Sequence, residues 1–75
     1  MYLHVGNNVV VREDELIGIF DIRNKRTNIY RFFLRPKMEK NQVIDLTDHF
    51  SPSSCVVTKD KIILSGISTR TLRKR

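Results

Sequence analysis

The apolar residues of this chain fall into short runs that are interrupted by a few polar residues, a pattern typical of β-hairpins. Near the N-terminus, Tyr2–Val5 and Val9–Arg12 flank the segment 6–8, Gly-Asn-Asn, and both residue types tolerate the positive φ of tight hairpin turns. Near the C-terminus, Cys55–Thr58 and Lys61–Ser65 are rich in β-branched and aliphatic residues and are separated by a single polar pair. The pattern therefore predicts one hairpin at each end of the chain.

A third strand is predicted at Leu16–Ile22, where apolar residues occupy positions on both faces. The same holds for the strand Lys61–Ser65. Because a chain of 75 residues has little material with which to cover both faces of a sheet, we expect the second face to meet another subunit. This predicts a homo-oligomer, and the interface candidates are Leu16, Phe20, Ile22, Ile62 and Leu64.

The middle of the chain has the pattern of an amphipathic helix. Thr27 or Asn28 is suited to cap it, and the segment Ile29–Arg35 follows. At 100° per residue, one broad face is apolar and the opposite face carries Arg31 and Arg35. The apolar face consists of Ile29, Tyr30, Phe33 and Leu34.

Pro36 limits this helix because it has no N–H to donate to the carbonyl of Phe32. The helix is therefore expected either to stop near Leu34 or to kink before the segment 37–41. Since Ile, Tyr and Phe also favour strands, a strand over residues 28–34 is the alternative. A short strand at Val43–Leu46 and a loop over residues 47–53 complete the middle.

The chain ends in a predicted short basic helix. Gly66 ends the preceding strand, Ser68 or Thr69 is suited to cap the helix, and Thr71–Arg75 supplies a basic last turn. We therefore predict one α+β domain over residues 1–75. It is a small antiparallel sheet of N-terminal and C-terminal hairpins, with one amphipathic helix in the middle and a short C-terminal helix.

The composition favours a cytoplasmic protein. Cys55 is the single cysteine, so no internal disulfide can form, and its place within a β run favours a buried thiol over a reactive one. No stretch reaches the ~18 apolar residues of a membrane span, and the N-terminus lacks the pattern of a signal peptide. We expect no membrane contact.

Positive charge is concentrated in two segments. The net charge is +6, residues 23–40 hold seven cations against one acid, and residues 70–75 hold four cations and no acid. Such a distribution attracts nucleic acid, although a basic surface that only keeps the protein soluble is the alternative. The candidate DNA-binding residues are Arg23, Lys25, Arg26, Arg31, Arg35, Arg70, Arg73, Lys74 and Arg75.

The sequence predicts no catalytic, metal or cofactor site. His4 and His49 are the only histidines, and neither they nor Cys55 show the close spacing of zinc ligands. Asp48, His49 and a serine do not make a triad without an accompanying nucleophile motif. The glycines are isolated, with no phosphate-binding spacing. The aromatic residues at 30, 32 and 33 are suited to stack bases, but their helical spacing favours core packing.

A series of motifs, taken together, is fairly specific. They are Met1–Gly6, Val9–Val11, Leu16–Asp21, Ser54–Thr58, Lys61–Ser65 and Ser68–Arg75. In this order and spacing they resemble the RemA/RemB family of extracellular matrix regulatory proteins, in its RemB branch. The resemblance covers nearly the whole chain, while residues 23–52 match only in pattern.

The resemblance implies an α+β protomer that assembles into closed rings. It also implies, for the RemA branch, a transcriptional regulator of biofilm matrix genes that binds DNA along the ring periphery, and it makes a RemA-type protein a candidate partner. RemA-type proteins place an arginine just before the third strand, where this chain has Glu15, and an arginine pair where it has the segment 49–52, His-Phe-Ser-Pro. Neither basic site carries over, so DNA binding would need the other cations.

Two functions are the main candidates at this point, and a third class, an enzyme, would need a cleft built between the subunits of a ring. The first is a non-enzymatic, oligomeric regulator that binds double-stranded DNA mainly through phosphates. The alternative is an oligomeric interaction or assembly module without direct DNA binding, whose basic tail serves only helix capping and solubility.

Overall fold

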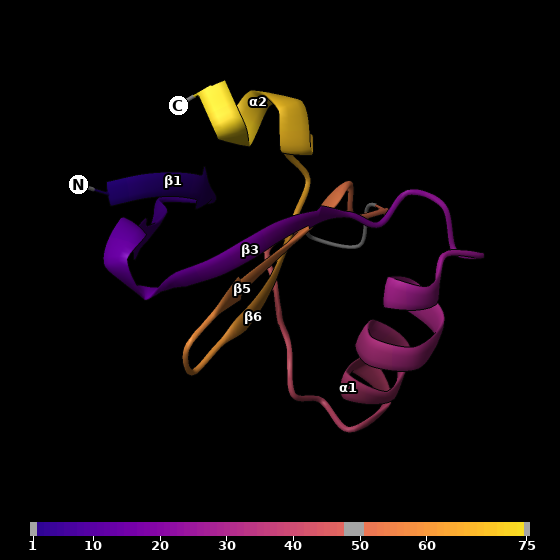
Figure 1. The fold of residues 1–75 in the computed structure, drawn as a ribbon. Coiled ribbons are helices and arrows are strands. Elements are labelled where there is room, and N and C mark those ends of the chain that lie inside the picture. Colours follow the sequence, from indigo (N-terminus) through magenta and orange to yellow (C-terminus); the bar gives the residue numbers. More distant parts are fainter. Residues whose placement is uncertain (1, 48–50, 75) are drawn as a thin grey trace.

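Two β-sheets form the centre of the computed structural model, which describes residues 2–47 and 51–74 (Figure 1). β1 and β2 make a two-stranded sheet, and the order β3-β5-β6-β4 makes a four-stranded one. The α+β class is thereby confirmed. The elements are β1 (Tyr2–Gly6), β2 (Val9–Arg12), η1 (Glu13–Glu15), β3 (Leu16–Asp21), η2 (Ile29–Leu34), α1 (Arg35–Glu39), β4 (Ile44–Asp45), β5 (Ser54–Thr58), β6 (Ile62–Ser65) and α2 (Thr69–Lys74).

The two hairpins form where the sequence predicts them. β1 and β2 pair antiparallel, and their turn holds Asn7 and Asn8 at φ 49° and 62°, the conformation for which Asn is favoured. β5 and β6 also pair antiparallel, and the amide of Thr58 donates to the carbonyl of Lys61 at 2.9 Å to close their turn.

The prediction of one antiparallel sheet that contains both hairpins is wrong in two respects. The β1-β2 hairpin stands apart as its own sheet, and β4 pairs with β6 in the parallel direction. The first difference arises because the hairpin packs its apolar side chains Leu3, Val5 and Val11 on the larger sheet rather than extending it. The parallel pairing spans only Ile44 and Asp45, too short a segment to have a distinctive pattern.

β3 contains a bulge that changes which side chains share a face. Leu16 pairs with Thr58 and Gly18 with Val57, so Ile17 is an extra residue on one strand. As a result Leu16 and Ile19 pack on the same cluster, whereas simple alternation places them on opposite faces. Ile17 itself is 65% exposed.

The middle segment is helical, so the alternative of a strand over residues 28–34 is wrong. Thr27 supplies the cap, since its hydroxyl accepts from the amide of Tyr30 at 3.4 Å. η2 is a π-helix, in which the amide of Arg35 donates to the carbonyl of Tyr30, five residues back. Pro36 then occupies the first turn of α1, a position that tolerates proline, so the helix does not stop near Leu34 but continues to Glu39.

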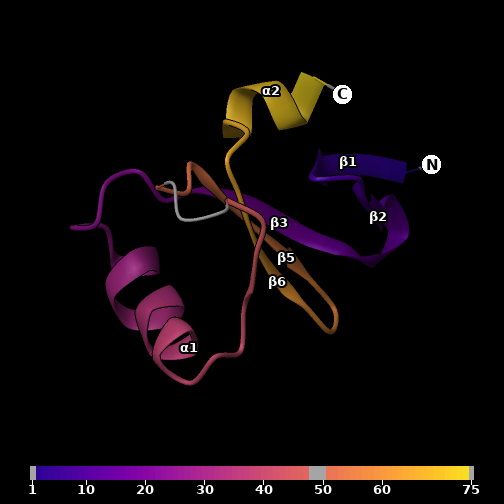
Figure 2. The same cartoon turned by 180° about the vertical axis from the view of Figure 1, so that it is seen from behind.

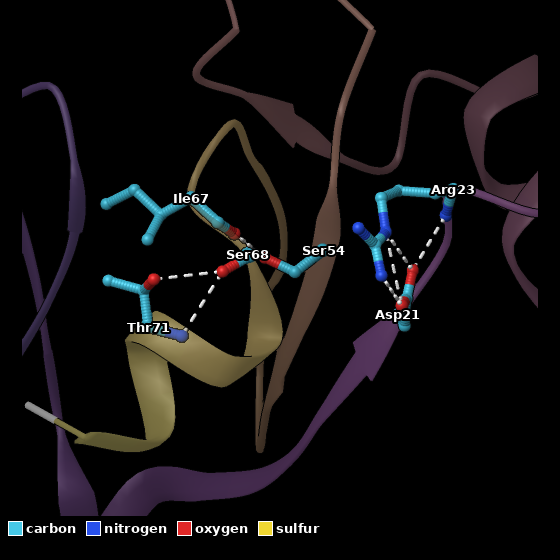
Figure 3. A network of polar contacts seen from close by, with 6 residues as sticks. All are labelled: Asp21, Arg23, Ser54, Ile67, Ser68 and Thr71. Carbon is cyan, nitrogen blue, oxygen red and sulfur yellow. Dashed lines mark hydrogen bonds and ion pairs between the residues drawn. The ribbon is translucent and has the colours of Figure 1, made fainter.

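α2 begins at the predicted cap. The hydroxyl of Ser68 accepts from the amide of Thr71 at 3.2 Å and also donates to its hydroxyl, as Figure 3 shows. In the same view, Ser54 of β5 donates to the carbonyl of Ile67 at 2.6 Å, which ties the start of α2 to the sheet. Leu72 then packs its side chain into the core.

Both faces of the four-stranded sheet are covered by the chain itself. On one face, the β1-β2 hairpin and α2 pack on Val56 and Ile63. On the other face, η2 and α1 pack on Cys55 and Leu64. Both views of the ribbon show the sheet lying between α2 and α1 (Figures 1 and 2). The premise that so short a chain leaves one sheet face uncovered is therefore wrong.

Candidate nucleic-acid interface

The cations predicted to bind DNA lie at the surface in three groups. All those that the structure describes are exposed, whereas Arg75 lies outside the described residues. They are Arg23, Lys25 and Arg26 in the loop after β3, Arg31 and Arg35 on the helix η2-α1, and Arg70, Arg73 and Lys74 on α2. Since η2-α1 and α2 lie on opposite sides of the sheet, one protomer presents two separate basic surfaces rather than one (Figures 1 and 2).

Arg23 is held by Asp21 at the end of β3 (Figure 3). Arg23 Nη2 donates to Asp21 Oδ2 at 2.7 Å, and its Nε donates to Oδ1 at 3.1 Å, a two-point contact. Hydrogen bonds from the Arg23 side chain and amide lower the pKa of Asp21 to about 2, and the pKa of Arg23 is raised in turn. The charge of Arg23 is therefore largely balanced within the protomer.

Lys25 and Arg26 differ from Arg23 in this respect. Among the described residues, no acid lies within ion-pair distance of either side chain. The loop is shaped by Asn24, whose side-chain oxygen accepts from the amide of Arg26 at 2.9 Å. Lys25 and Arg26 are thus the cations of this loop whose charge is available to an anion.

The helix cations have neighbours of their own. The Arg31 guanidinium lies 5.2 Å from the centre of the Phe32 ring, and Phe32 is 70% exposed. Arg35 Nε lies 3.5 Å from Glu39 Oε1, an exposed i,i+4 pair that contributes little to stability. Because Phe32 is exposed, it does not join the core, so the prediction of core packing is wrong for this aromatic residue. Tyr30 and Phe33 do pack against the core.

One cation of α2 has a structural contact. Arg73 Nη2 donates to the carbonyl of Ile19 at 3.1 Å, so this side chain fastens α2 to β3. No ion pair forms at Arg70 or Lys74 within the described residues. These two side chains are the exposed charges that α2 offers to a partner.

The fold also brings together three lysines that sequence reasoning did not group. Lys37 of α1, Lys59 and Lys61 line a hollow of about 350 Å³ between the helix and the turn of the β5-β6 hairpin. Asp60 lies there too, and it reduces the local charge. The only signal in the sequence was the pair of lysines around Asp60, since the contribution of Lys37 depends on how the helix docks.

The five interface candidates lie largely inside the protomer. Ile22 and Leu64 are buried, and Phe20 and Ile62 pack against the cluster that contains them. Leu16 packs against the cluster on the other face. These positions therefore contribute to the core of a single chain, and the homo-oligomer itself remains a prediction.

The placement of the cysteine and of the titratable side chains bears on the question of a metal site. No group of three or more His, Cys, Asp or Glu residues within 2–47 and 51–74 is placed to hold a metal ion. His49, which the triad idea needs, lies outside the described residues. Cys55 is buried, and burial raises the pKa of its thiol to about 11. In the part of the chain described here, no helix is both long and apolar enough to span a membrane.

Comparison with known proteins settles the relationship. The sequence model of the RemA-like family, described as extracellular matrix regulatory protein A-like, matches residues 2–75. The chain belongs to this family. Extracellular matrix regulatory protein B of Bacillus subtilis (strain 168) is 37% identical over 75 residues, which cover all of this chain and 89% of that protein.

This finding confirms the resemblance to the RemB branch of the RemA-like family. The described part of this RemA-like chain is the α+β fold reported above. The name of the family places the chain among matrix regulatory proteins.

Proposed function

We propose that this protein is a non-enzymatic, oligomeric regulator of extracellular matrix genes that binds double-stranded DNA through its phosphates. The observation that carries the proposal is the set of exposed cations without an acidic partner among the described residues, above all Lys25 and Arg26. Cations of this kind neutralise phosphates without first giving up an ion pair. The family and its Bacillus subtilis member are named as extracellular matrix regulatory proteins, which supports the same reading.

Oligomerisation is part of this proposal because the basic surfaces of one protomer are small and separated. Repeated copies place several such surfaces along one duplex, and their weak contacts then add through effective concentration. Binding of this type depends mainly on phosphates, so we expect little sequence specificity and a strong dependence on salt. Native mass spectrometry of the purified chain gives the number of copies directly.

The DNA proposal is tested by titrating a long fluorescent duplex with protein at several salt concentrations. The logarithm of the binding constant should fall steeply as salt rises from about 50 to about 200 mM. Lys25→Glu should weaken binding to all sequences alike and lower the slope by about one or more, because a phosphate contact is lost. Arg12→Glu is the matched control, since it changes the charge equally while Arg12 already pairs with Asp14 at 2.7 Å.

Two outcomes would contradict direct DNA binding. The first is a binding constant that does not change with salt, and the second is an equal effect of the Lys25 and Arg12 variants. If the protein forms a stable oligomer but does not bind the duplex even at low salt, an interaction module without direct DNA binding is favoured instead.

The second candidate function is an interaction module without direct DNA binding. It is favoured by exposed apolar side chains near the N-terminus: Tyr2 is 69% exposed, Val10 is 42% exposed and Ile17 is 65% exposed. Tyr2 and Val10 lie on strands of the same hairpin, whose buried side chains face the sheet. Tyr2→Ser with Val10→Thr should lower the native mass if this hairpin joins copies of the chain, whereas Phe32→Ser, at another exposed apolar position, should leave it unchanged.

A further inference from the structure

A pocket of about 380 Å³ opens between the helix η2-α1, the end of β3 and the segment before β5. Its apolar wall consists of Ile22, Tyr30, Met38 and Pro52. The volume lies at the lower end of the range for small-molecule sites, which have mostly apolar walls and a few placed polar groups. The pocket therefore has the size for a compact ligand.

The apolar wall is held in place by the core. Ile22 is only 2% exposed, and its amide donates to the carbonyl of Ser53 at 3.2 Å, which joins two sides of the pocket. Tyr30 and Met38 pack against the same cluster as Ile22. The amide of Ser53 also donates to the carbonyl of Ser65 at 2.9 Å, so this side is anchored to β6. The pocket is thus formed before any ligand arrives.

The helix beside the pocket has an unusual geometry. Tyr30 belongs to η2, and its carbonyl accepts from the amide of Arg35 in a π-type bond. π-helical turns are rare and occur frequently at functional sites. Here the wide turn carries Tyr30, the aromatic side chain that lines the pocket among the described residues.

The polar side of the pocket is cationic. Arg23 and Lys25 line it, and no acidic residue among those that the structure describes does so. The charge of Arg23 is balanced by Asp21, so Lys25 supplies the unpaired positive charge. Arg23 is fixed by its two-point contact with Asp21, whereas Lys25 has no acidic partner among the described residues. The pocket also includes Ser51 and Ser53, whose residue type supplies hydroxyl donors. An anionic group is the natural counterpart of this side.

We propose that this pocket binds a small amphiphilic anion, a molecule with a compact apolar ring and one phosphate or carboxylate group. The ring lies against Tyr30, Ile22 and Met38, and the anion faces Lys25 and the pinned guanidinium of Arg23. A bare inorganic anion leaves the apolar wall unused, and an extended peptide exceeds the volume. The site goes beyond DNA binding and does not depend on it.

The test is a titration of the full ¹⁵N-labelled chain with phenyl phosphate, followed by amide chemical shifts. Saturable shifts at Ile22, Tyr30, Met38 and Ser53 are the expected result. Benzoate in place of phenyl phosphate tells whether a carboxylate serves as well. Inorganic phosphate and phenol, each carrying half of the proposed chemistry, should bind at least about tenfold more weakly, because each lacks either the burial or the charge.

Two variants separate this site from a general attraction of anions. Lys25→Gln should weaken phenyl phosphate binding about fivefold or more, since it removes the unpaired cation. Lys40→Gln removes another exposed cation that does not line the pocket, and it should have no effect. Equal losses in both variants, shifts centred on Lys59 and Lys61, or an affinity for inorganic phosphate equal to that for phenyl phosphate would each overturn the proposal. The titration contains no nucleic acid, so its failure leaves the DNA proposal intact.

Discussion

The ring of Phe20 occupies the space beside Gly18 where a side chain would otherwise lie. A Cβ atom on Gly18 would stand 2.8 Å from Cζ and 2.9 Å from Cε2 of Phe20, closer than carbon atoms pack. The two residues are two positions apart on β3 and thus share a face of the sheet. Phe20 packs in turn against the cluster around Cys55 and Leu64. The missing side chain at position 18 lets an aromatic ring cover this part of the core.

We predict that Gly18→Ala destabilises the protein by about 1 kcal/mol or more, because the ring of Phe20 must leave its position. Urea unfolding measures the change. Gly66→Ala is the control, since a Cβ there meets nothing within 4 Å, and it should change stability by less than about 0.5 kcal/mol. Phe20→Leu should remove most of the penalty of Gly18→Ala. Equal stabilities of the two alanine variants would show that the ring moves without cost.

The ion pair of Asp21 with Arg23 predicts a dependence of stability on acid. The pKa of Asp21 falls from 3.8 to about 2 on folding, so the folded state favours the ionised carboxylate. The contribution is fully present above about pH 4 and disappears as the pH falls toward 2. Asp21→Asn should therefore unfold more easily than the parent at neutral pH, and the two should converge near pH 2. A constant gap across that range, measured by thermal unfolding, would exclude the ion pair as its source.

Local residue chemistry made the two hairpins and both helix caps predictable. Asn7 and Asn8 adopt the positive φ that their residue type permits, and Ser68 and Thr27 accept amide hydrogen bonds as capping residues do. These features depend on residues close together in the chain. The hairpins and helix caps can therefore be predicted from the pattern along the sequence alone.

Features that depend on distant residues were not predictable in the same way. The bulge at Ile17 is set by how β3 fits β5, and the packing of the β1-β2 hairpin on the sheet depends on contacts across the chain. The same holds for the candidate site. The exposure of the cations could be predicted from their charge, whereas the hydrogen bond of Arg73 to the Ile19 carbonyl joins residues far apart in the sequence and could not be predicted. The grouping of Lys37 with Lys59 and Lys61 likewise exists only in the folded chain.

A buried hydroxyl adds a hydrogen bond to the apolar packing between the N-terminal hairpin and the larger sheet. Ser65 Oγ donates to the carbonyl of Val5 at 2.6 Å and accepts from the amide of Ile67 at 3.1 Å, and Ser65 is fully buried. Ser65→Ala should cost about 1 to 3 kcal/mol, because the buried carbonyl of Val5 loses its partner away from water and the part-buried amide of Ile67 loses its partner as well. Amide hydrogen exchange in β1 and β2 should quicken as well.

The matched control for this prediction is Ser51→Ala, which removes a hydroxyl from an exposed position. It should leave the urea midpoint nearly unchanged, as surface substitutions usually do. If Ser65→Ala behaved like Ser51→Ala, the hairpin would be held by its apolar side chains alone.

The buried thiol of Cys55 gives a direct measure of how rarely the core opens. Burial raises its pKa from 9.0 to about 11, so at pH 8 the folded protein holds about a hundredfold less thiolate than the unfolded chain. Modification by a thiol reagent should be slow in buffer and fast in urea. Because the folded thiol keeps its proton, the stabilising effect is complete below pH 9 and is lost as the pH rises toward 11.

Cys55→Ser tests the two parts of this argument together. It abolishes the reaction and should also remove the loss of stability between about pH 9 and 11, because serine does not titrate there. Rapid modification of the parent in native buffer would mean that the face of the sheet covered by η2 and α1 opens readily. The pocket proposed above is lined by Tyr30 and Met38 of that helix. Such opening would therefore mean that the pocket is not preformed.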